Sequence, residues 1–200
     1  MKNKSMTYPI VFMTLLTIVT VFILAFLNQS TLAKVEENQN LELRRKILYV
    51  FDMYQEGETS DEEVNKLFEE NVVESDWNDQ KLYTLMEGSE EKAYAVPFAG
   101  PGLWGSINGY IGVDAAMETI TGVEFISQNE TPGLGGRIAE SPYKEQYRGV
   151  DISGATDKFV INRPAAGGNI DAIAGATQTS TYVETMINED LKTFNQGGNK

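Results

Sequence analysis

The sequence Asp171-Ala172-Ile173-Ala174-Gly175-Ala176-Thr177-Gln178-Thr179-Ser180 joins a tight turn of small residues to the start of a helix. Beyond it, apolar residues recur with the 3.6-residue period of an amphipathic helix, at Val183, Met186, Ile187, Leu191 and Phe194. Thr177 is therefore expected at or just before the first helical turn. Unpaired backbone N–H groups and the positive end of the helix dipole favour an anion there. A phosphate on the Thr177 hydroxyl would be well placed.

This pattern resembles the flavinylation motif of the FMN-binding domain family. The resemblance implies that a flavin transferase joins FMN through its phosphate to Thr177, and that Asp171 positions Thr177 or a metal ion during attachment. The rest of the implied attachment site is Gly175, Ala176 and Thr179. The chain departs from the family at Ala174, where serine or threonine is more usual. For Gly-Ala-Thr alone, an ordinary turn capped by a threonine is the alternative, because such short motifs are unspecific.

A second Ser-Gly-Ala-Thr sequence ends at Thr156. Its aspartate, Asp151, lies five residues before the threonine, whereas Asp171 lies six residues before Thr177. A charged Asp-Lys pair follows Thr156, and the next residues, 159–161, predict a short strand rather than an amphipathic helix. We therefore predict attachment at Thr177 and not at Thr156.

Two further segments extend the resemblance. Glu130-Thr131-Pro132-Gly133-Leu134-Gly135 resembles a segment of the same family, and Gly102-Leu103-Trp104-Gly105 is similar to the C subunit of the Na⁺-translocating NADH:quinone oxidoreductase. The G subunit of the Rnf ferredoxin-oxidising complex shares the motifs at Glu130 and Thr177, and it is the alternative within the family.

The resemblance also implies a pocket for the flavin ring. Its cofactor-binding residues would be Glu130, Thr131, Leu134, Gly135, Leu103 and Trp104. Glycines at positions 133, 135 and 136 would let the backbone approach a flat ring, and the apolar side chains would form its walls. Core packing is the alternative for those side chains, and Glu130 would either hydrogen-bond the ring or cap a turn.

Cysteine and histidine are both absent from the sequence. Their absence excludes disulfides, Cys or His nucleophiles, Fe–S clusters, c-type haem and the usual zinc sites. No catalytic residue and no metal site is predicted, and the chain has no Gly-x-Gly-x-x-Gly dinucleotide fingerprint. Any redox role must therefore come from a cofactor such as FMN.

Residues 8–27 contain no charged side chain. About 20 apolar residues at 1.5 Å each span a bilayer core of roughly 30 Å. Lys2 and Lys4 precede the run, which predicts a cytoplasmic N-terminus and a domain on the extracytoplasmic side of the cell membrane. A signal peptide cleaved near Thr31-Leu32-Ala33 is the alternative. The length of the run favours a retained anchor, and without cysteine a lipoprotein is excluded.

Setting aside Lys2 and Lys4, 14 basic residues face 29 acidic ones, a formal charge of −15. This balance argues against nucleic acid and anionic lipid surfaces as partners of the domain.

We expect the chain to have three parts: a cytoplasmic tip and transmembrane anchor at 1–30, a helical connecting region at 31–75, and an FMN-binding domain at 76–200.

The remaining pattern predicts an α+β fold. Helices are expected at 35–55, at 61–72 after the capping box Ser60-Asp61-Glu62-Glu63, and at 139–147. Strands are expected at 81–86 and 92–97, joined as a hairpin by Glu87-Gly88-Ser89-Glu90, and at 106–113 and 119–127. A polar loop is expected after residue 72, and no regular element at 130–137.

Together these observations predict a single-pass membrane flavoprotein that relays electrons one at a time within a sodium-pumping complex. Its partners would be the other membrane redox subunits, the flavin transferase that matures it, and the lipid bilayer around residues 8–27. It would not be catalytic alone. A membrane-tethered binding or sensing domain, with Thr177 unmodified, is the alternative from a different class.

Overall fold

The computed structural model describes residues 7–197, so the predictions for Lys2 and Lys4 lie outside the described residues. The chain divides into two compact units, which meet between Asn40 and Leu41. This boundary lies within the connecting region expected at 31–75, and residues 41–75 belong to the second unit.

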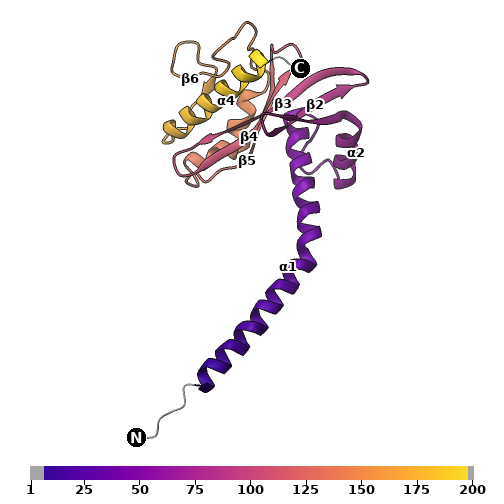
Figure 1. The fold of residues 1–200 in the computed structure, drawn as a ribbon. Helices are drawn as coiled ribbons and strands as arrows, with labels where there is room; N and C mark the ends of the chain where they lie inside the picture. Colours follow the sequence, from indigo (N-terminus) through magenta and orange to yellow (C-terminus); the bar gives the residue numbers. More distant parts are fainter. Residues whose placement is uncertain (1–6, 198–200) are drawn as a thin grey trace. The chain divides into compact units, whose positions relative to one another are not determined.

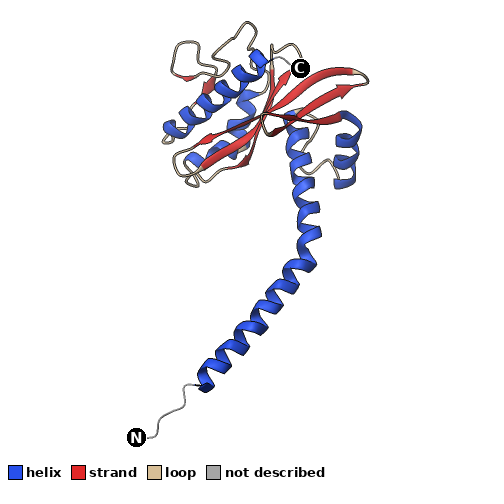
Figure 2. Cartoon of the chain, viewed as in Figure 1, coloured by secondary structure: helices blue, strands red, loops and turns tan. Residues whose placement is uncertain are grey.

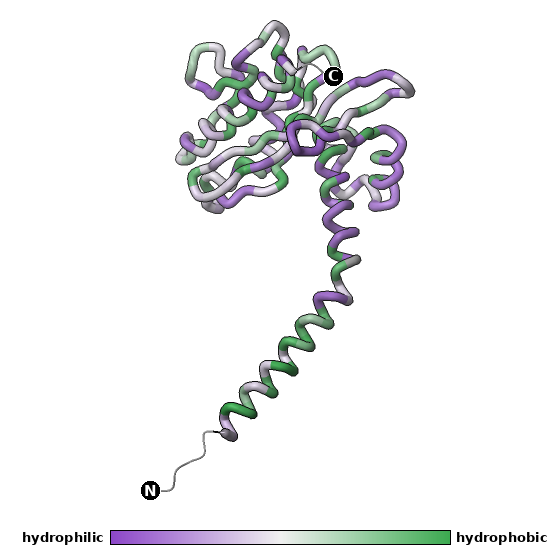
Figure 3. The backbone as a smooth tube through the Cα atoms, in the orientation of Figure 1, coloured by the Kyte–Doolittle hydropathy of each residue, from purple (hydrophilic) through white to green (hydrophobic). Residues whose placement is uncertain are grey.

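The first helix, α1, runs without a break from Thr7 to Val50. Its segment Thr7–Leu32 has a mean hydropathy of 2.8 with none of its most apolar window buried, and it is long and apolar enough to cross a membrane. This segment contains the uncharged run predicted at 8–27. Figure 3 shows the helix changing from hydrophobic to hydrophilic along its length. The helix expected at 35–55 is therefore the end of α1, and it stops at Val50 instead of residue 55.

The second unit contains a five-stranded antiparallel sheet in the order β1-β2-β3-β4-β5 (Figures 1 and 2). The strands are β1 Val72–Trp77, β2 Gln80–Glu87, β3 Glu90–Pro101, β4 Ser106–Asp114 and β5 Ile120–Ser127. The predicted hairpin at Glu87–Glu90 and the strands around 106–113 and 119–127 are confirmed. With helices on the sheet, the predicted α+β class is also confirmed.

Helices cover both faces of the sheet. The side chains of β3 alternate between the two faces and so contact helices on each side. Tyr94, Val96 and Phe98 join one hydrophobic cluster with helix α4, Thr177–Gly197. Ala93 and Ala95 join a second cluster with the end of α1 and with helix α2, Asp61–Asn71. Ser60 begins α2 as predicted, since its hydroxyl accepts a hydrogen bond from the Glu63 N–H at 3.3 Å.

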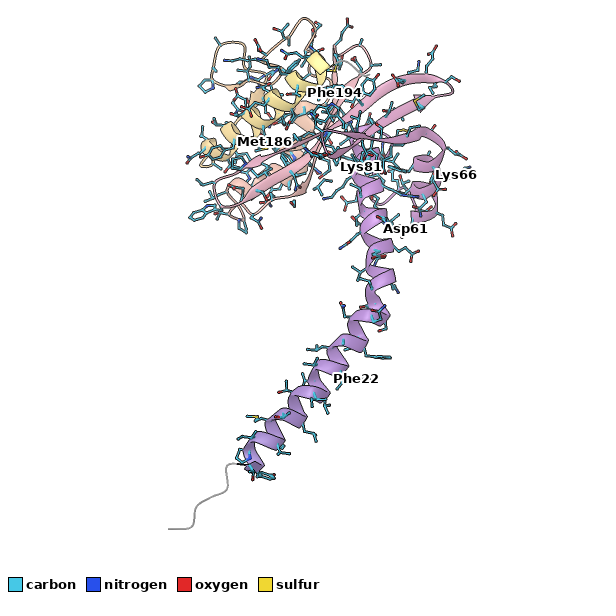
Figure 4. All side chains as sticks on the ribbon, viewed as in Figure 1. Phe22, Asp61, Lys66, Lys81, Met186 and Phe194 are labelled. Carbon is cyan, nitrogen blue, oxygen red and sulfur yellow. The ribbon has the colours of Figure 1, made fainter. Side chains whose placement is uncertain are left out.

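Helix α4 begins at Thr177, where the turn of small residues ends. Every apolar residue of the predicted stripe is buried, from Val183 to Phe194. Met186 and Phe194, labelled in Figure 4, belong to the hydrophobic cluster that α4 shares with the sheet. The Phe194 ring packs edge-on against Tyr94 with 5.3 Å between centroids.

Several expected elements are wrong in detail. Strand β1 replaces the polar loop expected after residue 72. The helix expected at 139–147 is a chain of short pieces, α3 Ser141–Lys144 and the 3₁₀ turn η2 Glu145–Tyr147. A further 3₁₀ turn, η1 Gly135–Ala139, begins inside the glycine-rich segment expected to be irregular.

The strand expected at 159–161 is also wrong. The N–H groups of Phe159 and Val160 both donate to Asn188 Oδ1 on α4, at 2.8 and 2.9 Å, and Asn188 Nδ2 donates to the Val160 carbonyl at 2.7 Å. A side-chain amide thus takes the place of a neighbouring strand. Short strands follow instead at β6 Asn162–Arg163 and β7 Ile170–Asp171, which pair in parallel.

We expect Asn188→Ala to destabilise the domain, because it leaves three backbone groups of Phe159 and Val160 without their partner. Each buried group left unpaired costs roughly 1–3 kcal/mol, so the melting temperature in detergent should fall clearly. Asn195→Ala, at an exposed position of the same helix, is the control and should change it little. Equal melting temperatures for the two variants would contradict this account.

Candidate cofactor site

The turn before α4 is closed by a hydrogen bond from the Ala176 N–H to the Ile173 carbonyl, at 2.9 Å. Gly175 occupies its third position with φ of +81°, a conformation that glycine adopts without strain. Ser180, fully buried one turn into the helix, accepts from the Ile173 N–H at 3.0 Å and fixes the turn to α4. Thr177 is left exposed as the first helical residue.

A cavity of about 280 Å³ opens beside Thr177. It brings together ten of the eleven predicted cofactor residues from three separate segments of the chain, with Gln178 as an addition that the sequence did not predict. The lining residues are Leu103, Trp104, Glu130, Thr131, Leu134, Gly135, Gly175, Ala176, Thr177, Gln178 and Thr179.

Three apolar side chains around this cavity are exposed. Leu103 is 45% exposed, Trp104 70% and Leu134 47%, so they do not pack in the core. Within the described part of the second unit, Val73 is the one other large hydrophobic side chain that is comparably exposed. Exposed apolar side chains gathered around one cavity indicate a site for an apolar group.

Glu130 joins the three segments. The carboxylate is buried, with 5% of the residue exposed. Oε1 accepts from the N–H groups of Leu103, at 2.8 Å, and Trp104, at 3.1 Å, while Oε2 accepts from the Thr179 hydroxyl at 2.6 Å. Glu130 thus caps the turn between β3 and β4, which is one of the two roles expected for it.

Gly135 lacks a side chain for a reason of packing that the sequence did not reveal. A Cβ at this position would lie 2.6 Å from Thr179 Oγ1 and 2.7 Å from Glu130 Oε2. The space that a Cβ would need is therefore occupied by the Glu130–Thr179 hydrogen bond. Gly133 has φ of +74° and open space around it, so its glycine serves the turn conformation.

Thr131 shapes the glycine-rich segment through its backbone. Its carbonyl accepts from the N–H groups of Leu134, at 3.1 Å, and Gly136, at 3.0 Å, which turns the chain so that Leu134 lines the cavity. Asp171, by contrast, does not line it. Its carboxylate pairs with Arg163 at 2.9 Å, and its N–H donates to Gln146 Oε1 at 2.7 Å.

The second Gly-Ala-Thr has the same local turn. The Ala155 N–H donates to the Ile152 carbonyl at 3.0 Å, and Gly154 has φ of +73°. What differs is the continuation: no helix begins at Thr156, and Thr156 does not line the cavity. The next residue, Asp157, is instead ion-paired with Lys192.

A larger cavity, of about 670 Å³, lies at the end of α1. Charged side chains dominate it and pair with one another, Glu124 with Lys144 and Glu145 with Arg148. Lys144 and Arg148 also sit on the Tyr49 ring, while burial and the bond to Glu145 raise the Tyr49 pKa well above its usual value. The contacts of Lys144 and Arg148 with Tyr49 hold the end of α1 against the rest of the second unit. No exposed apolar wall is present among the residues that line this cavity.

We expect Gly135→Ala to break the Thr179–Glu130 hydrogen bond, because the added methyl group would overlap both oxygen atoms. The melting temperature should fall, and the cavity should lose its shape. Gly197→Ala is the matched control, since a Cβ there meets nothing within 4 Å. A Gly135→Ala variant as stable as the Gly197→Ala variant would show that the carboxylate moves aside at little cost.

Comparisons of the sequence and of the structure with known proteins agree with one another. Residues 102–192 match the model of the FMN-binding domain family. The chain is 33% identical over 129 residues to the C subunit of the Na⁺-translocating NADH-quinone reductase of Chlamydia pneumoniae, covering 54% of this chain and 40% of that protein. It is 31% identical over 109 residues to the corresponding protein of Vibrio anguillarum, covering 52% and 43%. The chain thus spans well under half the length of these relatives.

Two solved structures have the same fold. The chain superposes on the C subunit of the Na⁺-translocating NADH-quinone reductase from Parabacteroides distasonis with a TM-score of 0.64 and 26% identity, covering 80% of this chain and 93% of that one. For NqrC of Shewanella oneidensis the TM-score is 0.65 at 21% identity, covering 80% and 98%. The predicted resemblance to the FMN-binding domain family, and within it to the C subunit of the reductase, is confirmed.

Proposed function

We propose that this chain is a membrane-anchored flavoprotein subunit of a complex like the Na⁺-translocating NADH:quinone oxidoreductase, with FMN joined through a phosphoester to Thr177. One observation carries the proposal: Thr177 is the exposed first residue of a helix and lies on the rim of a cavity with exposed apolar walls. When bound, FMN would supply electron transfer, which the side chains of this chain do not provide.

The residues fit both ends of FMN. Near Thr177 the helix dipole favours a phosphate by roughly 0.3–1 kcal/mol at an exposed position. Leu103, Trp104 and Leu134 offer apolar surface to the ring. The cavity, about 280 Å³, is at the small end of ligand pockets. The ring would therefore be held along part of its surface and keep an edge open to neighbouring proteins, as a relay needs.

Within such a complex the chain would pass electrons one at a time between neighbouring redox subunits. The NADH and quinone sites would lie on other subunits, since this chain has no dinucleotide fingerprint. Covalent attachment suits a domain outside the cytoplasm, where dissociated FMN would be diluted and occupancy lost by mass action.

The Rnf G subunit remains the alternative within the family, and neighbouring genes distinguish the two complexes. The Gly102-Leu103-Trp104-Gly105 segment and the names of the matching relatives favour the C subunit of the Na⁺-translocating reductase.

The attachment site is tested by Thr177→Ala after co-expression with a flavin transferase. The unchanged chain should gain the mass of FMN less one water, and Thr177→Ala should gain nothing. Thr156→Ala is the matched control, because Thr156 follows the same local turn, and it should be modified normally. FMN found on the Thr156 peptide would overturn the site assignment. An unmodified wild-type chain would favour the tethered binding or sensing domain.

The anchor and its orientation form a separate part of the proposal. Thr7–Leu32 would remain in the bilayer with the domain outside the cytoplasm. Protease added to intact spheroplasts should degrade the domain, with a cytoplasmic protein as the protected control. Full protection of the domain would contradict this orientation. A mature N-terminus near residue 33 would show cleavage of a signal peptide instead.

A further inference from the structure

We infer that Glu130 is a positioning residue: its carboxylate holds the Leu103–Trp104 loop against the start of α4 and so places the Trp104 wall beside Thr177. The inference rests on the proposed function, because the position of this wall matters only if a flavin ring lies against it. It concerns hydrogen bonds within the protein and assigns Glu130 no bond to the cofactor.

The carboxylate divides its oxygens between two segments. Oε1 accepts hydrogen bonds from the adjacent N–H groups of Leu103 and Trp104, at the tip of the hairpin between β3 and β4. Oε2 accepts a hydrogen bond from the hydroxyl of Thr179, which lies two residues after Thr177. A charged acceptor makes these bonds stronger than those between neutral groups. One side chain therefore connects the exposed wall to the attachment helix.

The packing around the carboxylate is independent evidence for this role. A Cβ added at Gly102 would lie 2.5 Å from Oε1, and one added at Gly135 would lie 2.7 Å from Oε2. Each oxygen is thus approached by a glycine, one from the hairpin and one from the segment that contains Glu130. The hairpin itself is closed by a bond from the Gly102 N–H to the Gly105 carbonyl, at 2.7 Å.

Trp104 is a central residue of the turn that the Gly102–Gly105 bond closes, and Glu130 connects that turn to α4. Trp104 is 70% exposed, and exposed side chains change rotamer on the ps–ns timescale, so what the protein can fix is the backbone from which this side chain projects. The N–H of Trp104 is fixed by Glu130 alone among the hydrogen bonds that the structure gives for it. The position of this turn relative to α4 therefore depends on the carboxylate.

Glutamine and alanine distinguish hydrogen bonding from charge at this position. In Glu130→Gln the amide oxygen can accept both N–H groups, and the amide nitrogen can donate to Thr179 Oγ1. The connections are kept while the charge is lost. Glu130→Ala removes both. At Thr179, valine removes the hydroxyl, and serine keeps it.

The test uses the full-length, flavin-free chain in detergent, with Trp77→Phe so that Trp104 is the single tryptophan. We expect Glu130→Ala to lower the steady-state fluorescence anisotropy of Trp104 on the order of twofold, because motion of the released turn is added to that of the side chain. Glu130→Gln should restore most of the difference. Thr179→Val should lower the anisotropy, and Thr179→Ser should not.

Unchanged anisotropy in a folded Glu130→Ala variant would overturn the inference, as would Glu130→Gln behaving like alanine. If Glu130→Ala fails to fold by circular dichroism, the Thr179 pair decides: a lower value for valine supports the role, and equal values overturn it. The intact mass after co-expression with transferase is measured separately. Absence of FMN from the wild type would contradict the proposed function without altering the Trp104 result.

Discussion

Packing of helix α4 against the sheet is the constraint from which the geometry of the site follows. The buried stripe from Thr179 to Phe194 fixes the rotation of the helix about its axis. Because successive helical residues are about 100° apart, burying Thr179 turns Thr177 outward. The same packing that stabilises the domain thus presents one hydroxyl to solvent and directs another at Glu130. No special feature of Thr177 is needed beyond its place in the helix.

The part of the site that lies close together in the sequence was predictable. The period of α4 located its beginning, and the three short segments supplied ten of the residues that meet around the cavity. The sequence could not indicate how those segments touch. That Glu130 faces the backbone of Leu103 and the hydroxyl of Thr179 depends on pairings across the fold. Gln178 was missed because a polar residue on a helix carries no signal of its neighbours.

The errors in the fold have similar causes. Strand β1 lies at the edge of the sheet, and its residues 73–76 are exposed, so no alternation of polar and apolar residues marked it. Residues 159–161 are apolar enough to be a strand, but Asn188 satisfies their backbone. Hydrogen bonds with Asn188, which lies 28 residues after Val160, take the place of the expected pairing with a neighbouring strand. Asp171 lies near Thr177 in sequence, yet its carboxylate pairs with Arg163 and it does not line the cavity.

The two Ile-x-Gly-Ala turns show how little a local conformation decides. Both close the same hydrogen bond and place glycine in the same left-handed region. One is followed by a helix and opens on a cavity, and the other is not. Any enzyme that selects between the two threonines must therefore respond to the sequence or structure on either side of the turn.

The bonds of Glu130 span 27 residues to Leu103 and 49 to Thr179. Contacts of this range cost loop-closure entropy before they stabilise anything, so they form together with the rest of the domain. The cavity is therefore formed only when all three segments are in place, because none of them forms it alone. Unfolding of α4 from the sheet therefore separates Thr179 from Glu130 and removes the connection between the wall and Thr177.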